Sequence, residues 1–182
     1  YVKGKLTTRA GQLVARGTPV DAERMNRFGL LADALRTTSV PDCPEVAGQD
    51  PARTHAAFLE SYFSNYVEGT RFSIEEAEGI ALHNRIVPTR PKDSHDILGV
   101  FKLILHPQFR SSLPAPMDIL EGLKERHRQM LERRPEANPG EFKEAANYAG
   151  QTKFVDPAFV RGTLLEGVRL AFSVPEGLAR AI

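Results

Sequence analysis

The residues of this chain that are best suited to chemistry are its histidines, its carboxylates and its single cysteine, Cys43. The five histidines are His55, His83, His95, His106 and His127. None of them stands in the His-Glu-x-x-His spacing that turns two imidazoles toward one zinc ion, and one cysteine cannot complete a zinc site. The sequence also lacks the glycine-rich phosphate loops and the Gly-x-Ser-x-Gly nucleophile elbow. These signatures of zinc enzymes, P-loop proteins and serine hydrolases are therefore absent from the 182 residues.

Glu68 is the carboxylate whose position is least expected. It comes at the end of an apolar, helix-periodic stretch and directly precedes Gly69, a residue typical of the position after a helix. The partial negative charge at a helix C-terminus disfavours a carboxylate there by about 0.3–1 kcal/mol. Two interpretations stay open: the side chain is solvated, or it faces a cation from another part of the protein.

Apolar residues recur at the helical period through most of the chain, so helices are expected to position these groups. Asp50-Pro51 and Asp156-Pro157 each pair a capping residue with a proline, and residues 73–76 form a capping box. One expected helix is capped by Asp93 or Ser94 and stops near Pro107. The other helices that we expect are Val20–Thr38, Pro51–Glu68, Ile74 to about Asn84, Met117–Arg134, Pro157–Val174 and Glu176–Ile182.

The helical period is lost from Phe142 to Val155, and this stretch predicts a short β-hairpin. The expected fold class is therefore all-α with one small β element. The aromatic stripe from Phe58 to Tyr66 is expected in the core. His127, on the apolar face of its helix, is expected to be a core histidine with a satisfied partner.

Charge and composition narrow the classes of partner. The chain has 24 Lys and Arg against 23 Asp and Glu, a net charge of +1, which argues against a nucleic-acid partner. No apolar run approaches the roughly 18 residues of a membrane helix, and the N-terminus has no signal-peptide pattern. We therefore expect no membrane partner. A single cysteine favours a cytoplasmic protein without disulfides.

Several short motifs resemble, in order, those of the Fic family (filamentation induced by cAMP). Residues 64–69 (Ser-Asn-Tyr-Val-Glu-Gly) match its inhibitory motif (Ser/Thr)-x-x-x-Glu-(Gly/Asn), and residues 73–77 match the run that comes after it. Residues 123–127, 139–143 and 154–157 resemble the family's Leu-x-x-x-His, Pro-Gly-x-Phe-Arg and Phe-Val-Pro-Pro pieces. The resemblance covers about residues 57–182. The chain departs from it at Thr70, where asparagine is common, and at Asp156, which replaces a proline.

The resemblance implies a Fic-like helical bundle with a short β-hairpin flap. It also implies transfer of AMP from ATP, with Mg²⁺, to a hydroxyl of a target protein. The family's catalytic motif is His-Pro-Phe-x-(Asp/Glu)-Gly-Asn-Gly-Arg, in which the histidine is the general base and the acidic residue holds the metal. Some family members use other phosphate-containing substrates, so the resemblance leaves ATP itself open.

That catalytic motif is not found in the 182 residues. Residues 106–110 (His-Pro-Gln-Phe-Arg) imitate its beginning, but they lack the acidic residue and the glycines and precede the flap, so we reject them as catalytic. We expect the motif after Ile182 in a longer protein, and therefore assign neither a catalytic residue nor a metal ligand within this chain. The implied organisation is an arm at 1–49, an inhibitory-helix region at 50–90 and the N-terminal part of the Fic core at 91–182.

The resemblance assigns two sets of residues. Ser64, Glu68 and Gly69 form the inhibitory motif, in which Glu68 would pair with the second arginine of the catalytic motif and keep ATP in an unproductive pose. The target-docking flap is Gln151, Thr152, Lys153, Phe154 and Val155, which would bind the target protein by strand addition. The alternative function is a non-catalytic helical interaction module or a degenerate Fic relative. A homo-oligomer is left open.

Overall fold

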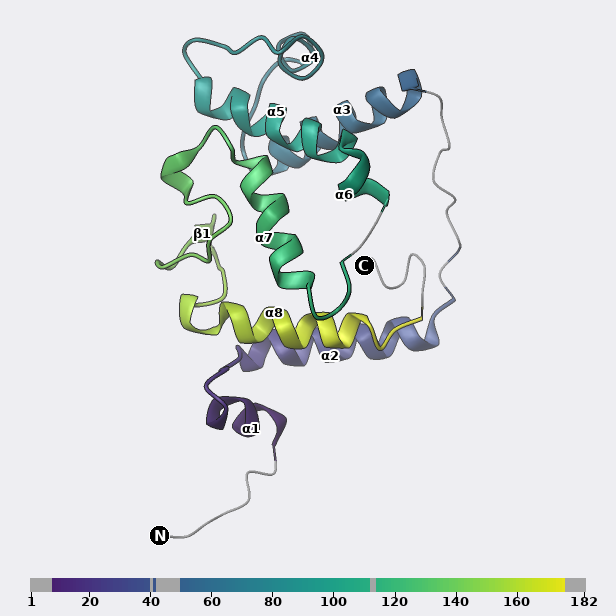
Figure 1. The fold of residues 1–182 in the computed structure, drawn as a ribbon, viewed down its shortest axis with the longest axis vertical. Coiled ribbons are helices and arrows are strands. Elements are labelled where there is room, and N and C mark those ends of the chain that lie inside the picture. The colour runs from purple at the N-terminus through teal and green to yellow at the C-terminus, as the bar shows by residue number, and fades with distance from the viewer. Residues whose placement is uncertain (1–7, 40, 42–49, 112–113, 176–182) are drawn as a thin grey trace. The chain divides into compact units, whose positions relative to one another are not determined.

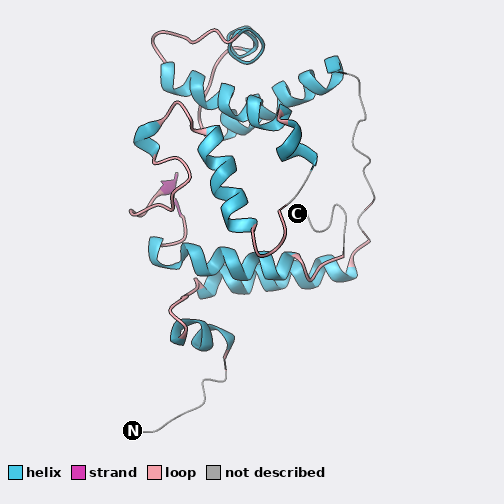
Figure 2. Cartoon of the chain, viewed as in Figure 1, coloured by secondary structure: helices cyan, strands magenta, loops and turns pink. Residues whose placement is uncertain are grey.

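The computed structural model describes residues 8–39, 41, 50–111 and 114–175, and these are mostly helical (Figure 2). The all-α class with one small β element is therefore confirmed. The chain forms two compact units. We call residues 44–141 the central unit, and residues 1–43 together with 142–182 the terminal unit. The expected division at residues 49 and 90 remains a prediction.

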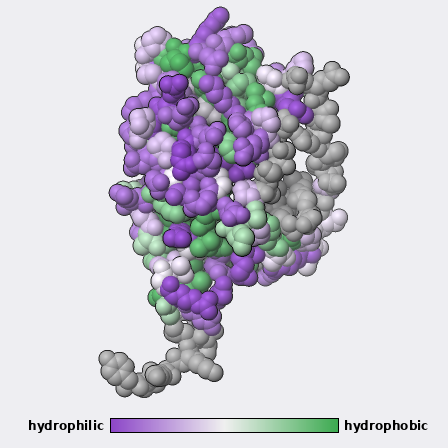
Figure 3. Space-filling model, in the orientation of Figure 1, coloured by the Kyte–Doolittle hydropathy of each residue, from purple (hydrophilic) through white to green (hydrophobic). Residues whose placement is uncertain are grey.

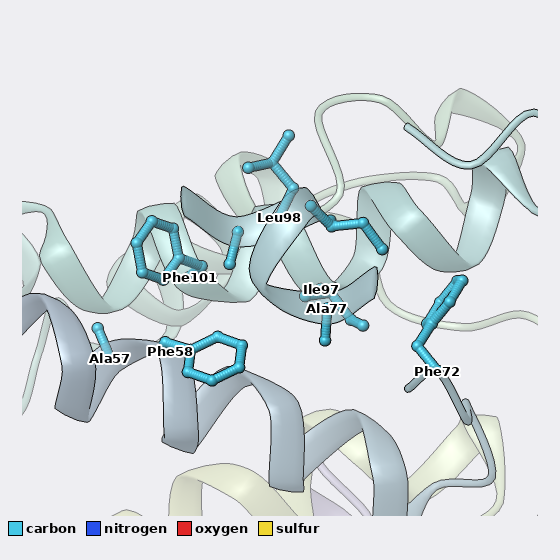
Figure 4. Packing of buried hydrophobic residues seen from close by; sticks show 9 residues of the cluster. Ala57, Phe58, Phe72, Ala77, Ile97, Leu98 and Phe101 are labelled. Atoms are coloured by element: carbon cyan, nitrogen blue, oxygen red, sulfur yellow. The ribbon is translucent and has the colours of Figure 1, made fainter. Parts of the chain in front are cut away.

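The central unit is built on two helices that pack against each other, α3 (Asp50–Val67) and α5 (Pro91–Leu105) (Figure 1). The same unit contains α4 (Ile74–His83), α6 (Pro107–Ser111), α7 (Ile119–Met130) and the short 3₁₀ helix η1 (Pro135–Ala137). Figure 4 shows the core where α3, α4 and α5 meet. Phe58, Ile80 and Ile97 are fully buried there. Ser61 joins this core because its hydroxyl donates to the Ile97 carbonyl over 2.6 Å.

Capping by nearby residues explains where α4 begins and ends. The Ser73 hydroxyl accepts from the Glu76 backbone N–H, and the Glu76 carboxylate accepts from the Ser73 N–H, so the predicted capping box is confirmed. The helix ends at Asn84, whose φ of 54° lies in the left-handed region that asparagine tolerates. Both ends of this helix are thus decided by residues within a few positions of them.

Two predicted helix ends are wrong. α5 begins at Pro91, so neither Asp93 nor Ser94 is its N-cap. The two side chains instead bind Arg90: the Asp93 carboxylate accepts from its guanidinium, and the Ser94 hydroxyl donates to its carbonyl. α7 runs only from Ile119 to Met130, because the chain turns at Leu131 and continues into η1.

Close contacts fix α7 against α5. A Cβ atom on Gly99 would lie 2.0 Å from the Met130 carbonyl oxygen, so only glycine lets these two segments approach so closely. Just beyond α7, one guanidinium nitrogen of Arg134, Nη1, lies 2.7 and 2.5 Å from the two carboxylate oxygens of Asp96. Arg134 Nε donates to Glu136 instead, so this arginine ties α5 to η1.

The terminal unit is built on α2 (Ala22–Thr37) and α8 (Pro157–Ala171), which lie side by side (Figure 1). Asp21 and Asp156 cap the two helices, the second as predicted. A Cβ atom on Gly162 would lie 2.2 Å from the Pro19 carbonyl oxygen. Beside it, the buried Thr163 hydroxyl accepts from the Asp21 N–H over 2.9 Å. α8 therefore packs against the segment that precedes α2.

A short helix that sequence periodicity did not indicate, α1 (Arg9–Ala15), completes the described helices of this unit. Its Arg9 guanidinium donates to the buried Glu166 carboxylate over 2.6 Å, and Arg169 donates to the same group over 2.8 Å. The Arg9 hydrogen bond is the main reason that the pKa of Glu166 is below its ordinary value, and Arg169 acts in the same direction while burial opposes it. This carboxylate therefore ties α1 to α8.

The predicted hairpin is also present in the terminal unit. β1 (Tyr148–Ala149) and β2 (Thr152–Lys153) pair antiparallel, with Tyr148 opposite Lys153. The helix expected at 176–182 lies outside the described residues. Among the helices that are described, none has the length and apolar character needed to cross a membrane.

Candidate functional site: the end of α3 and the β1–β2 hairpin

The end of α3 is closed by backbone hydrogen bonds around Gly69. Its N–H donates to the Tyr66 carbonyl over 3.1 Å, and the Thr70 N–H donates to the Asn65 carbonyl over 3.0 Å. Gly69 has a φ of 100°, a conformation that glycine adopts without the strain a side chain would bring. The prediction that Gly69 terminates this helix is confirmed.

Glu68 sits one residue beyond the last residue of α3, and its side chain is exposed. Within the described part of the chain it has neither a hydrogen-bond nor an ion-pair partner. Ser64, in the last turn of α3, is also exposed. The structure thus brings the three predicted inhibitory residues together at one solvent-facing helix end.

The aromatic stripe of α3 is only partly core, which corrects the expectation. Phe58 is 2% exposed, and the half-buried Tyr62 donates its hydroxyl to the Phe72 carbonyl over 3.2 Å. By contrast Phe63 and Val67 are 56% and 80% exposed. Periodicity identified the apolar residues but not how wide the buried face would be.

The predicted flap residues form the second strand of the hairpin and the short segment between that strand and α8. Gln151, Thr152, Lys153 and Phe154 are exposed and Val155 is half-buried. Gly150, in the turn, has a φ of 57°. The Phe154 N–H donates to the Asn147 carbonyl over 3.1 Å, which extends the pairing one step beyond the two-residue strands.

The outer edge of β2 already accepts a hydrogen bond from α2. In an antiparallel ladder the backbone groups alternate between the partner strand and the outer edge. Because Phe154 bonds inward, the backbone groups of Lys153 point outward on the β2 side. The Arg24 guanidinium of α2 donates to the Lys153 carbonyl over 2.9 Å. Strand addition along β2 would have to compete with Arg24 at that carbonyl.

An apolar groove of about 630 Å³, the α2/α8 groove, has walls that come from α2, from residues on either side of the β1–β2 hairpin, and from α8. Figure 3 shows hydrophobic residues reaching the surface in this region. Phe154 and Val155 line one end of the groove, and Phe28, Leu31, Leu164 and Val168 line its walls. Sequence reasoning did not predict this groove. The signal that could have indicated one wall is the i, i+4 spacing of Val160, Leu164 and Val168 along α8.

The remaining predicted residues fall in the central unit. His127 is half-buried and lies outside the core, so the expected core position is wrong. The expected partner is confirmed, because its Nδ1 accepts from the Gly140 N–H over 2.9 Å. His106, which imitates the start of a catalytic motif, packs its ring 4.6 Å from that of Phe109. The inhibitory residues thus belong to the central unit, and the flap residues belong to the terminal unit.

No described cluster offers three His, Cys, Asp or Glu side chains that could hold a metal ion, so we assign no Mg²⁺ ligand here. No protein-family model matches this chain, and neither a curated protein nor a solved structure is detectably similar to it. Function is therefore inferred from the motifs and from the geometry of the two units.

Proposed function

We propose that this chain belongs to a Fic-type protein adenylyltransferase, which transfers AMP from ATP to a hydroxyl of a target protein and is restrained by Glu68. The observation that carries the proposal is the end of α3, where an exposed carboxylate without a partner among the described residues follows a helix whose dipole disfavours it. A cation brought to this helix end would offset the repulsion between the carboxylate and the helix dipole, and the inhibitory role requires such a cation.

The proposed reaction forms a bond between the α-phosphorus of ATP and the target oxygen, while the bond to pyrophosphate breaks. The hydroxyl proton passes to a general base, which the resemblance places after Ile182. The part proposed for the central unit is restraint. Glu68 would pair with an arginine that otherwise holds the γ-phosphate, because a carboxylate and a phosphate compete for the same guanidinium.

The part proposed for the terminal unit is target docking. Exposed strand residues with free backbone groups accept an added strand from a partner. The hairpin residues from Gln151 to Phe154 are exposed, and Arg24 holds the Lys153 carbonyl from the side of α2. A target segment would pair with the hairpin either by displacing Arg24 or along the other edge, at Tyr148.

The donor chemistry is tested with the whole product of the gene that encodes this chain. The product is incubated with Mg²⁺ and ATP carrying a label on either its α- or its γ-phosphate. AMP transfer predicts protein-bound label from the α-phosphate only, with release of pyrophosphate. Label from the γ-phosphate would indicate a kinase, and the absence of label from both, with Glu68 replaced, would refute the proposal.

A further inference from the structure

The α2/α8 groove is a long surface feature whose two helical walls the proposed function does not use; the groove meets the flap only at Phe154 and Val155, at one end. Its wall residues on α8 run from Val160 to Ala171, a length of about 16 Å at the helical rise, and Val174 lies just beyond the helix. Leu31 and Phe28 on the α2 wall remain 43% and 37% exposed. The groove is therefore an open trough along two packed helices, with a row of apolar side chains still facing solvent.

The shape of this trough suits a helix. Two helices that lie side by side, here of 16 and 15 residues, leave between them a groove into which the side-chain ridge of a third helix can pack. A helix laid in such a groove contacts it through apolar residues at i, i+3, i+4 and i+7. A volume of about 630 Å³ has room for several such side chains.

The positive charge at one end of the groove favours a bound helix that carries an acidic residue. Among the residues that line the groove, Lys143 is the one with a charged side chain, and it lies at the hairpin end. Its ammonium contacts the Asn147 side-chain oxygen and lies 5.8 Å from the Phe154 ring centre, which leaves donors for an incoming anion. The described residues of the terminal unit carry nine Lys and Arg against six Asp and Glu, a net charge of +3.

We infer that the α2/α8 groove is a docking site for an amphipathic helix of a partner protein. The helix would place its apolar face on Leu31, Leu164 and Val168 and an acidic residue at Lys143. Burial of apolar surface supplies the attraction, and the lysine fixes which way the helix points. The inference concerns the terminal unit alone and does not depend on AMP transfer.

The test uses the 182-residue chain and a fluorescent synthetic helix of about 15 residues, matched to the length of α8. The probe is built from leucine, alanine and glutamine, with leucines at i, i+3, i+4 and i+7 and one glutamate at an end. Fluorescence anisotropy should show saturable binding. A probe of the same composition with scrambled leucines should not bind.

Two neighbouring leucines on α2 provide a matched pair of variants. Leu31 lines the groove, whereas Leu30, 65% exposed, is not among its lining residues. Leu31→Gln should weaken binding about tenfold, and Leu30→Gln should leave it unchanged. Both leucines are exposed, and circular dichroism would verify that both variants keep their helices.

A charge exchange tests the orientation. Lys143→Glu should weaken binding of the glutamate probe about fivefold, and replacing that glutamate by lysine in the probe should restore it. Absence of saturable binding, or equal losses for Leu30→Gln and Leu31→Gln, would overturn the inference. So would a concentration-dependent dimer that Leu31→Gln dissolves, since the groove would then join two copies of the chain.

Discussion

His127 is hydrogen-bonded to Gly140 across a turn: the Gly140 backbone N–H donates to the imidazole Nδ1 over 2.9 Å. Gly140 is buried and has a φ of 81°. Since Nδ1 accepts a hydrogen bond, the neutral ring carries its proton on Nε2. The bond joins the end of α7 to the turn after η1, and so connects two of the sequence motifs that suggested the family resemblance.

Replacing His127 should destabilise the protein. His127→Ala leaves the buried Gly140 N–H without its acceptor, which should lower the free energy of unfolding by about 1–3 kcal/mol in a urea titration. His83→Ala is the matched control, because His83 is exposed at the end of α4. Equal stability of the His127 variant and the control would show that the hydrogen bond contributes nothing.

Gly162 and Gly29 should respond to alanine in opposite directions. A methyl group on Gly162 meets the Pro19 carbonyl at 2.2 Å, so Gly162→Ala forces α8 away from that segment and should cost about 1–3 kcal/mol. Gly29, within α2, has nothing within 4 Å of the position that a Cβ would take, so Gly29→Ala should stabilise by about 0.5–1 kcal/mol. Thermal unfolding measures both. A stabilising Gly162→Ala would contradict the described packing.

The Glu166 ion pairs should make stability depend on pH in acid. The pKa of Glu166 is lowered in the folded protein, so its ionised form stabilises the fold above the ordinary value of 4.5, and that contribution is lost as the pH falls through the folded pKa. At neutral pH, Glu166→Gln should lower the free energy of unfolding by about 1–3 kcal/mol. Urea titrations of the wild-type protein and Glu166→Gln, made from neutral to acid pH, should give free energies of unfolding that converge as the pH falls below 4.5.

Glu23→Gln is the control for that series, because the Glu23 side chain is 74% exposed beside Arg27. A surface pair between i and i+4 should contribute no more than about 0.5 kcal/mol. If the difference between the wild-type protein and Glu166→Gln were constant through acid pH, the carboxylate would not be ionised in the native state and the assigned pairing would be wrong.

A variant in the flap should affect target modification and ATP binding to different extents. Phe154 is 43% exposed, packs beside Lys143 and comes directly after the β2 strand. In the whole gene product, Phe154→Ala should reduce modification of the target protein more than it reduces ATP binding, because the flap contacts only the target in the proposed function. Titration of ATP binding and a modification assay give the two values. Equal loss in both would assign Phe154 to folding instead.

Sequence alone predicted the features that depend on neighbours in the chain. Ser73 caps α4 and Asp156 caps α8 through partners no more than three residues away, and Gly69 ends α3 through its own conformation. The hairpin was predicted from loss of the helical period. These features are decided by a few adjacent residues, so local patterns contain the information.

Features that depend on distant residues could not be predicted. Arg9 meets Glu166 across 157 positions, and no periodicity indicates such a pair. The exposure of Phe63 depends on which helices cover α3, and the α2/α8 groove exists only once these two helices pack together. At the candidate site, the position of Glu68 was predictable, whereas the contact of Arg24 with Lys153 required the fold of the terminal unit.

The most direct test of the proposed restraint is a comparison of two glutamates of the same region. Glu68 lies just after α3 and Glu60 is exposed within it. In the whole gene product supplied with Mg²⁺ and α-labelled ATP, Glu68→Gly and Glu68→Gln should each raise incorporation of AMP into protein about tenfold or more, the effect of losing one charge-assisted contact of about 1.5–3 kcal/mol. Glu60→Gln should change nothing. Incorporation that is the same in the wild-type protein and all three variants would contradict the inhibitory role of Glu68.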